Sequence, residues 1–177
     1  MEVLKLKKIS DSVIEAVNAA SLKVMEIYDL NDFDIIDKSD GSPVTLADKV
    51  SHEVLSTSLK LIDDDIPILS EEGDSYNNNS DLFWLIDPLD GTKEFINRNG
   101  EFTVNVALVE NGIPILGVVA APAIDEIFVG FSDQAYKIIN KKKSKIASRK
   151  QLQEFCLVTV SKSHKSEKDQ LFIDLCK

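Results

Sequence analysis

The chain has 177 residues, and its 30 Asp and Glu against 20 Lys and Arg give a formal net charge of −10 at pH 7. With 44% hydrophobic and 28% charged residues, it has the composition of a soluble globular protein of one domain, or of one domain and part of another. The acidic balance argues against nucleic acid as a partner, because phosphate binding needs clustered Lys and Arg. No apolar stretch approaches the roughly 18 residues of a membrane span. Cys156 and Cys176 lack metal-ligand spacing, which favours buried thiols in a reducing cytoplasm.

Two amphipathic helices are predicted in the first third of the chain. Apolar residues recur at three- and four-residue steps over Ile9–Tyr28 and again over Leu46–Ile62. Thr45 and Asp48 fit a capping box at the start of the second helix. Between the helices, a short extended piece is expected at Phe33–Ile36.

A run of short strands is predicted after the second helix. The expected strands are Ile66–Leu69, Leu82–Ile86, Phe102–Val109, Ile113–Ala120, Ile127–Phe131 and Ala135–Ile139. Leu82–Ile86 is apolar throughout and is predicted to be fully buried. Asn111-Gly112 is a strong hairpin signal between two of the strands. Helices followed by strands in tight turns predict an α+β fold, a layered helix/sheet arrangement with a largely antiparallel sheet flanked by helices.

A boundary is expected near residue 150. The basic run Lys141–Lys145 is interpreted as a solvated turn at the end of an N-terminal α+β domain of residues 1–150. Residues 151–177 offer one strand, Phe155–Val160, and one helix, Glu167–Cys176. Because a lone strand and helix cannot close a hydrophobic core, we interpret 151–177 as the beginning of an incomplete α/β C-terminal domain.

The most informative stretch follows the apolar strand at 82–86. Asp87 and Asp90 lie three residues apart at the end of a strand, in a turn that Pro88 and Gly91 shape. Burying two carboxylates together is costly unless a cation or protons neutralise them. Leu89 can add only its backbone carbonyl. Such oxygen-only ligands favour Mg²⁺ or Mn²⁺ over zinc.

A second acidic corner, Glu71-Glu72, follows the short strand at 66–69. If that strand lies beside the strand at 82–86, Glu71 meets Asp87 and Asp90. The composite is then a multi-metal site of the kind that clamps a phosphate between cations. An acidic turn that serves only solubility remains the alternative for each corner.

These motifs carry a family resemblance. Trp84-Leu85-Ile86-Asp87-Pro88-Leu89-Asp90-Gly91-Thr92 resembles the first motif of the inositol monophosphatase superfamily, which comprises metal-dependent, lithium-sensitive phosphatases. The continuation Lys93-Glu94-Phe95 is most similar to its CysQ-like branch, the 3′(2′),5′-bisphosphate nucleotidases. The resemblance implies a cytoplasmic Mg²⁺-dependent phosphomonoesterase that hydrolyses adenosine 3′,5′-bisphosphate to AMP and phosphate. It implies two or more Mg²⁺ ions, with Mn²⁺ able to substitute.

The resemblance also assigns roles to individual residues. Glu71, Asp87 and the Leu89 carbonyl are expected to hold a first Mg²⁺, and Asp87 with Asp90 a second. Thr92, Asp48 and Glu71 are expected to orient and deprotonate the attacking water, because a hydroxyl linked to a buried carboxylate can relay a proton. The substrate phosphate is expected to meet Glu71, Leu89, Asp90, Gly91 and Thr92, with the last two offering backbone N–H groups. The capping box explains Asp48 without catalysis, and His52 is interpreted as a surface or rim histidine.

One motif of the superfamily is not found. Nothing after Asp90 resembles its Trp-Asp-x-Ala motif, whose Asp completes the second metal site, so we expect the N-terminal part of a longer enzyme with impaired activity. An inositol-1-phosphate or sugar-phosphate phosphatase is an alternative, against which Lys93-Glu94 argues. A non-catalytic metal-binding remnant is another. A homodimer and peripheral attachment to the cytoplasmic face of the inner membrane are left open.

Overall fold

The computed structural model describes residues 3–30, 35–37, 43–73, 80–148, 159 and 167–175. The chain divides into two compact units, Met1–Ile146 and Ala147–Lys177. In the second unit, the described residues contain the helix α4 (Glu167–Leu175), where a helix was predicted. Most of the predicted strand Phe155–Val160 lies outside the described residues. None of the helices in the described ranges is long and apolar enough to cross a membrane.

The first unit contains two long helices, α1 (Val3–Tyr28) and α2 (Leu46–Ile62), of which α2 has the predicted bounds. Helix α1 begins earlier than predicted, because its buried stripe already starts at Leu6. Between them, β1 (Ile35–Asp37) and β2 (Pro43–Thr45) form a two-stranded antiparallel sheet.

A mixed seven-stranded sheet makes up most of the remaining first unit, which also holds a 3-10 helix, Pro122–Ile124. Its strands, in spatial and chain order, are β3 (Ile68–Ser70), β4 (Leu82–Asp90), β5 (Thr103–Glu110), β6 (Ile113–Ala121), β7 (Glu126–Phe131), β8 (Gln134–Ile139) and β9 (Lys142–Lys145). β3 and β4 run parallel, and every later neighbour is antiparallel. Asn111 and Gly112 both have positive φ in the β5–β6 turn, as an Asn-Gly hairpin requires.

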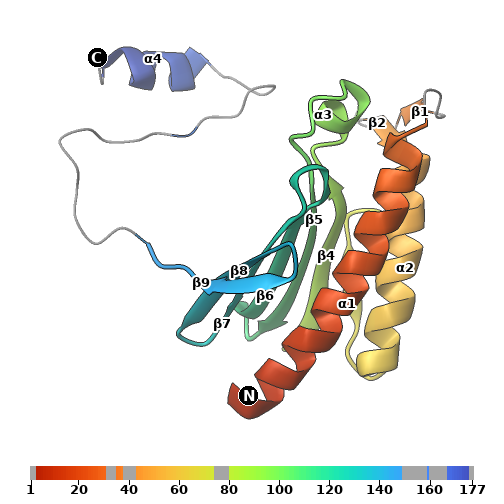
Figure 1. Ribbon diagram of the computed structural model, residues 1–177, viewed down its shortest axis with the longest axis vertical. Coiled ribbons are helices and arrows are strands. Elements are labelled where there is room, and N and C mark those ends of the chain that lie inside the picture. Colours follow the sequence, from red (N-terminus) through yellow and green to blue (C-terminus); the bar gives the residue numbers. More distant parts are fainter. Residues whose placement is uncertain are drawn as a thin grey trace. The chain divides into compact units, whose positions relative to one another are not determined.

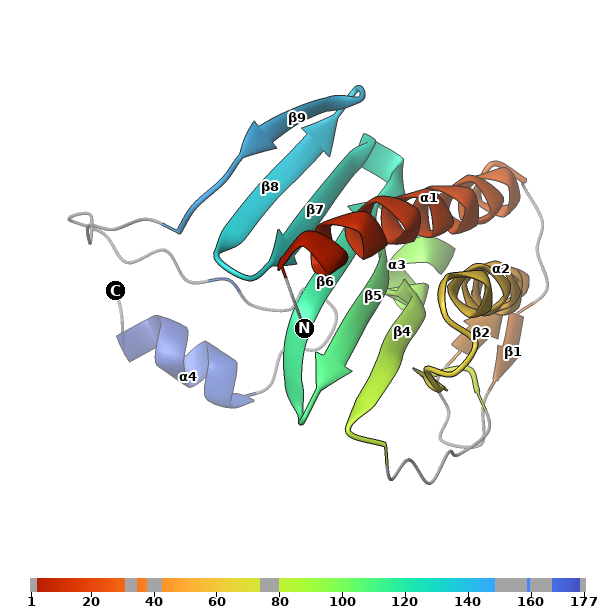
Figure 2. The same cartoon turned by 90° about the horizontal axis from the view of Figure 1, so that it is seen from below.

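The two helices pack against the sheet. α1 contacts β5, β6 and β7, whereas α2 contacts β4 and α1. Figures 1 and 2 show both helices beside the sheet, with α2 nearest β4. Side chains from both helices and from alternate strand positions form one core, which includes Val17, Leu55, Trp84, Leu108 and Val118. The predicted α+β layered architecture is therefore confirmed.

The prediction that the strand at 82–86 is fully buried is wrong. Trp84 and Ile86 lie in the core, but Leu85 between them is 43% exposed. Val119 on β6 is 38% exposed in the same way, next to the buried Val118. Because successive side chains of a strand point to opposite faces, the face of the sheet away from the core carries exposed apolar residues.

The basic run forms a strand rather than the predicted turn. The turn is confined to Asn140 and Lys141, which both have positive φ, and the lysines that follow form β9 against β8. All four β9 residues are exposed, and the Lys143 ammonium lies 3.3 Å from the centre of the Tyr136 ring. Charged residues on an edge strand discourage pairing with further strands, which suits this position at the end of the sheet order.

Candidate metal centre

The parallel pairing of β3 and β4 brings the two acidic corners together. Ser70 at the end of β3 is the register partner of Ile86, so Glu71 follows beside Asp87. The Glu71 backbone N–H donates a hydrogen bond to the Ile86 carbonyl at 3.3 Å. The Glu71 side chain is near enough to Asp87 to raise the pKa of that carboxyl. Of the predicted meeting of Glu71 with Asp87 and Asp90, the fold contains the pairing of the two strands and the position of Glu71 beside Asp87.

The carboxyl group of Asp87 has a pKa well above the ordinary value of an aspartate. Burial and the neighbouring negative charges of Glu71 and Asp90 raise the pKa of Asp87 to about 7, against a lowering by a hydrogen bond from the Leu89 backbone. Its Oδ1 atom is buried and has no hydrogen-bond partner. A carboxylate in this state needs either a proton or a cation beside it.

The chemistry of the donors fits a hard divalent cation. Glu71, Asp87 and Asp90 offer carboxylate oxygens, and the Leu89 carbonyl lies in the same turn. Among the described residues, no three His, Cys, Asp or Glu side chains are arranged so that they could hold a metal ion. The first predicted ion needs only two carboxylates, from Glu71 and Asp87, together with the backbone carbonyl of Leu89. The buried, unpartnered Asp87 Oδ1 is the feature that a cation would satisfy.

Gly91 shapes the turn that carries these groups. It has φ of 90° and ψ of 41°, and a Cβ atom there would lie 2.9 Å from the Glu101 carbonyl oxygen. Glycine is thus required by both conformation and space. Directly after it, the short helix α3 (Thr92–Ile96) begins.

Asp48 and Thr92 are joined by a hydrogen bond across 44 residues of sequence. The Thr92 Oγ1 hydroxyl lies 3.2 Å from Asp48 Oδ1 and 3.2 Å from the Leu89 carbonyl. The other oxygen, Asp48 Oδ2, accepts hydrogen bonds of 2.7 Å from both the backbone N–H and the hydroxyl of Thr45. Asp48 is 1% exposed, and burial raises its pKa against the lowering by these hydrogen bonds. The capping box and the contact with Thr92 are therefore two uses of one carboxylate.

Three residues beside the centre had no predicted role in the site. His52, interpreted from the sequence as a surface or rim residue, is partly buried and hydrogen-bonded to Ser70. Ser51 is fully buried and bonds to the Pro88 carbonyl. Asn105, the cross-strand partner of Asp87, has a buried Oδ1 without a hydrogen-bond partner. From the sequence, only the helical spacing of residues 48, 51 and 52 could have indicated that Ser51 and His52 lie on the same side of the helix as Asp48.

A groove of about 480 Å³ adjoins the centre on the exposed face of the sheet. Glu71, Asp87 and Asn105 line it together with apolar residues such as Leu85 and Val119. The site therefore opens toward a predominantly apolar surface.

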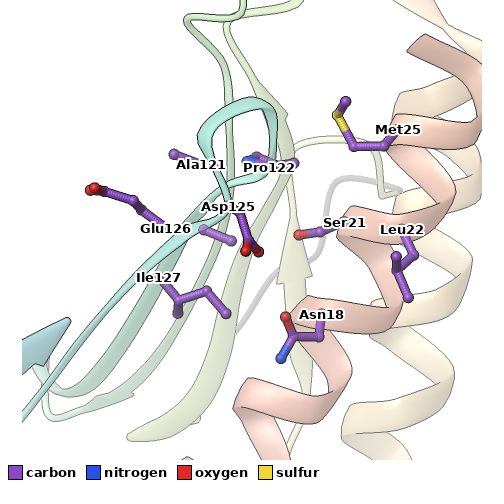
Figure 3. Close-up of a pocket in the computed structure, with 10 residues that line it drawn as sticks. Asn18, Ser21, Leu22, Met25, Ala121, Pro122, Asp125, Glu126 and Ile127 are labelled. Atoms are coloured by element: carbon purple, nitrogen blue, oxygen red, sulfur yellow. The ribbon is translucent and has the colours of Figure 1, made fainter. Parts of the chain in front are cut away.

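A separate, smaller pocket of about 90 Å³ lies between α1 and the segment from β6 to β7. Figure 3 shows Ser21 and Asn18 on α1 and Asp125 on the facing turn. Ser21 Oγ is buried there without a hydrogen-bond partner. No residue of the two acidic corners lines this pocket, so it is distinct from the candidate metal centre.

Comparison with known proteins gives consistent matches. The inositol monophosphatase family model matches residues 5–174. The chain is 40% identical over 169 residues to the 3′(2′),5′-bisphosphate nucleotidase CysQ of Buchnera aphidicola, covering 91% of this chain and 62% of the relative. It is 41% identical over 162 residues to the protein of that name from Escherichia coli K12, covering 87% and 63%. The crystal structure of CysQ from Bacteroides thetaiotaomicron matches with a TM-score of 0.79 at 33% identity, covering 95% of this chain and 68% of that one.

Proposed function

The chain belongs to the inositol monophosphatase family, and from this premise we propose that it serves the metal-dependent hydrolysis of a 3′(2′),5′-bisphosphate nucleotide. Adenosine 3′,5′-bisphosphate is the proposed substrate, with AMP and phosphate as products. The relatives named as nucleotidases, at 40% and 41% identity, support this choice over an inositol phosphate. The chain spans 62% and 63% of the length of these relatives. The activity of the whole enzyme is therefore part of the proposal.

One observation carries the proposal: the hydrogen bond from Thr92 Oγ1 to Asp48 Oδ1, beside the acidic corners of Glu71 and Asp87. A threonine hydroxyl is a poor base by itself. When it is hydrogen-bonded to a buried carboxylate, it can pass its proton to that carboxylate as it accepts one from water. A pure capping role for Asp48 needs only the Thr45 contacts and leaves the Thr92 contact without a purpose.

We propose that Glu71, Asp87 and the Leu89 carbonyl hold one Mg²⁺, and that Asp87 and Asp90 hold a second. Bound there, the cations supply Lewis-acid polarisation of the phosphate and lower the pKa of water. The unpartnered Asp87 Oδ1 supports this assignment. A solved relative, titled an inositol monophosphatase and NADP phosphatase complexed with NADP and Ca²⁺, shares the fold at 17% identity with a TM-score of 0.67.

The residues of the chain then have separate tasks. Thr92 Oγ1 holds a water molecule on its open side and moves that water's proton to Asp48 Oδ1. Glu71, exposed at the mouth of the site, orients the same water. The backbone N–H groups of Gly91 and Thr92 receive phosphate oxygens at the start of α3. We also propose that residues 1–150 form the domain that carries this site and that 151–177 begin a second one.

Phosphate release from adenosine 3′,5′-bisphosphate and from inositol-1-phosphate, with Mg²⁺ and with a chelator, tests the proposal. We expect weak Mg²⁺-dependent release that favours the nucleotide and is lost in Asp87→Asn. Faster release from inositol-1-phosphate would replace the substrate assignment. Calorimetric Mg²⁺ binding that Asp87→Asn abolishes, without any phosphate release, would support a non-catalytic metal-binding role instead.

A further inference from the structure

Helix α2 presents three polar side chains toward the two acidic corners. Asp48, Ser51 and His52 stand at positions i, i+3 and i+4, which share one side of a helix. Each contacts a different part of the site: Thr92, the Pro88 carbonyl and Ser70, respectively. A single rigid element therefore touches both of the turns whose carboxylates must meet.

Ser51 fixes the turn that follows β4. Its side chain is 0% exposed, and its Oγ donates a 2.7 Å hydrogen bond to the carbonyl of Pro88, which is 37 residues away in sequence. Pro88 precedes Leu89, whose carbonyl is one of the proposed metal ligands. A buried carbonyl left without its donor loses the group that fixes the orientation of its peptide plane.

His52 fixes the turn that follows β3. Its Nδ1 and Ser70 Oγ lie 2.8 Å apart, and Ser70 Oγ also accepts a 3.2 Å hydrogen bond from the Glu72 backbone N–H. A methyl group placed on Gly73 would lie 3.8 Å from His52 Cε1, so the imidazole packs along this turn. Glu71 lies between Ser70 and Glu72, the two residues that this second hydrogen bond joins.

We propose that Ser51 and His52 are positioning residues that hold the two acidic turns at the separation a shared cation requires. Neither side chain touches the substrate or the cation; Ser51 acts through the Pro88 carbonyl and His52 through the Ser70 hydroxyl. This inference rests on the proposed function, because it concerns the same metal centre. It adds the prediction that metal affinity depends on hydrogen bonds made by α2, outside the ligand set.

Mn²⁺ binding to the full 177-residue chain, measured from the electron paramagnetic resonance signal of free Mn²⁺, tests the role of His52. His52→Phe keeps a ring against the turn but removes Nδ1, whereas His52→Asn keeps a hydrogen-bonding atom in the position of Nδ1 and shortens the side chain. Groups that orient metal ligands typically change affinity by about 10- to 100-fold. We expect His52→Phe to weaken Mn²⁺ binding by about tenfold and His52→Asn to restore binding to within about threefold of the unaltered chain.

Ser51→Ala is expected to weaken Mn²⁺ binding by a similar factor, with the exposed Thr57→Ala on the same helix as the control that leaves binding unchanged. Thermal unfolding of each metal-free variant shows whether a loss of affinity merely follows a loss of stability. The proposal is overturned if His52→Phe binds as the unaltered chain does, or if Asn and Phe weaken binding equally. If the unaltered chain and Asp87→Asn bind Mn²⁺ alike, the metal centre itself is wrong, and the proposed function fails along with this inference.

Discussion

At the scale of single residues, the carboxylate of Asp48 links helix formation to the candidate chemistry. One oxygen closes the capping box with Thr45, and the other receives the Thr92 hydroxyl. The same side chain therefore stabilises the start of α2 and sets the place of a hydroxyl on α3. This double use explains why an N-cap partner is found buried against a turn 44 residues away.

Removing the Thr92 hydroxyl tests its proposed proton transfer. Thr92→Val keeps the shape of the side chain but cannot donate to Asp48, and general base contributions are commonly about 10²- to 10⁴-fold in rate. We expect at least a 100-fold fall in the rate of phosphate release, while Thr92→Ser retains most of the activity. A Thr92→Val variant within about twofold of the unaltered chain would contradict the role; the assay is initial-rate phosphate release at saturating Mg²⁺.

Removing the charge of Asp87 tests the repulsion between the neighbouring carboxylates of the centre. Asp87→Asn takes away one of three neighbouring negative charges, so the metal-free chain at pH 8 should gain about 1 kcal/mol of unfolding free energy. The same variant should lose the stabilisation that Mg²⁺ gives to the unaltered chain, because ligand binding to the folded state raises its stability. Urea unfolding with Mg²⁺ and with a chelator measures both effects. Equal Mg²⁺ stabilisation of the two proteins is the contrary result.

At the scale of elements, the passage from β4 into α3 is the part of the fold that builds the site. β4 continues through Asp90, so its last residues are strand and candidate ligands at once, and Gly91 turns the chain into α3. The register with β5 shifts between Asp87 and Asp90, which marks an irregularity where the carboxylates are needed. Such bulges re-aim side chains at the edge of active sites.

Gly91→Ala should lower the free energy of unfolding by more than the positive φ of the residue alone would cost. Both Gly91 and Gly112 have positive φ, but a Cβ at Gly91 meets the Glu101 carbonyl oxygen at 2.9 Å, whereas one at Gly112 has nothing within 4 Å. We expect Gly112→Ala to cost about 1 kcal/mol of unfolding free energy and Gly91→Ala about 2 to 3 kcal/mol. Urea unfolding of the two variants gives the comparison, and equal costs would show that the close approach is relieved without strain.

At the scale of the whole molecule, the first unit is a sheet whose two faces differ. The core face carries Val118 at 0% exposure, while the next residue, Val119, lies on the groove beside the metal centre and is 38% exposed. Because this groove adjoins the metal centre, the exposed apolar face and the site lie on the same side of the sheet. The curated relatives are longer than the stretch that this chain matches.

Two neighbouring substitutions test this orientation. Val118→Asp buries an unpaired charge in the core and should prevent cooperative folding, because such burial costs several kcal/mol. Val119→Asp places the same group on the exposed face and should change the unfolding free energy by no more than about 0.5 kcal/mol. Circular dichroism followed by urea unfolding distinguishes the two. Comparable losses in both variants would mean that the second face is covered.

Several features of this protein could be predicted from sequence because they depend on near neighbours. The apolar repeat of α2, the Thr45–Asp48 capping box and the Asn111-Gly112 turn are local patterns, and each was found where expected. The order of helices and strands also sufficed for the α+β layered fold. The burial of β4 and the secondary structure of residues 141–145 could not be predicted, because both depend on which strand or layer packs alongside.

The sequence by itself determined the elements, the acidic corners and the types of ligand atom that they offer. Only the tertiary structure decided that β3 lies parallel to β4, so that Glu71 reaches Asp87, and that α2 contacts both turns through Ser51 and His52. The physical reason is separation along the chain. Contacts spanning 18, 37 and 44 residues carry no local periodicity, and they form only when packing of the core brings helix and strands together.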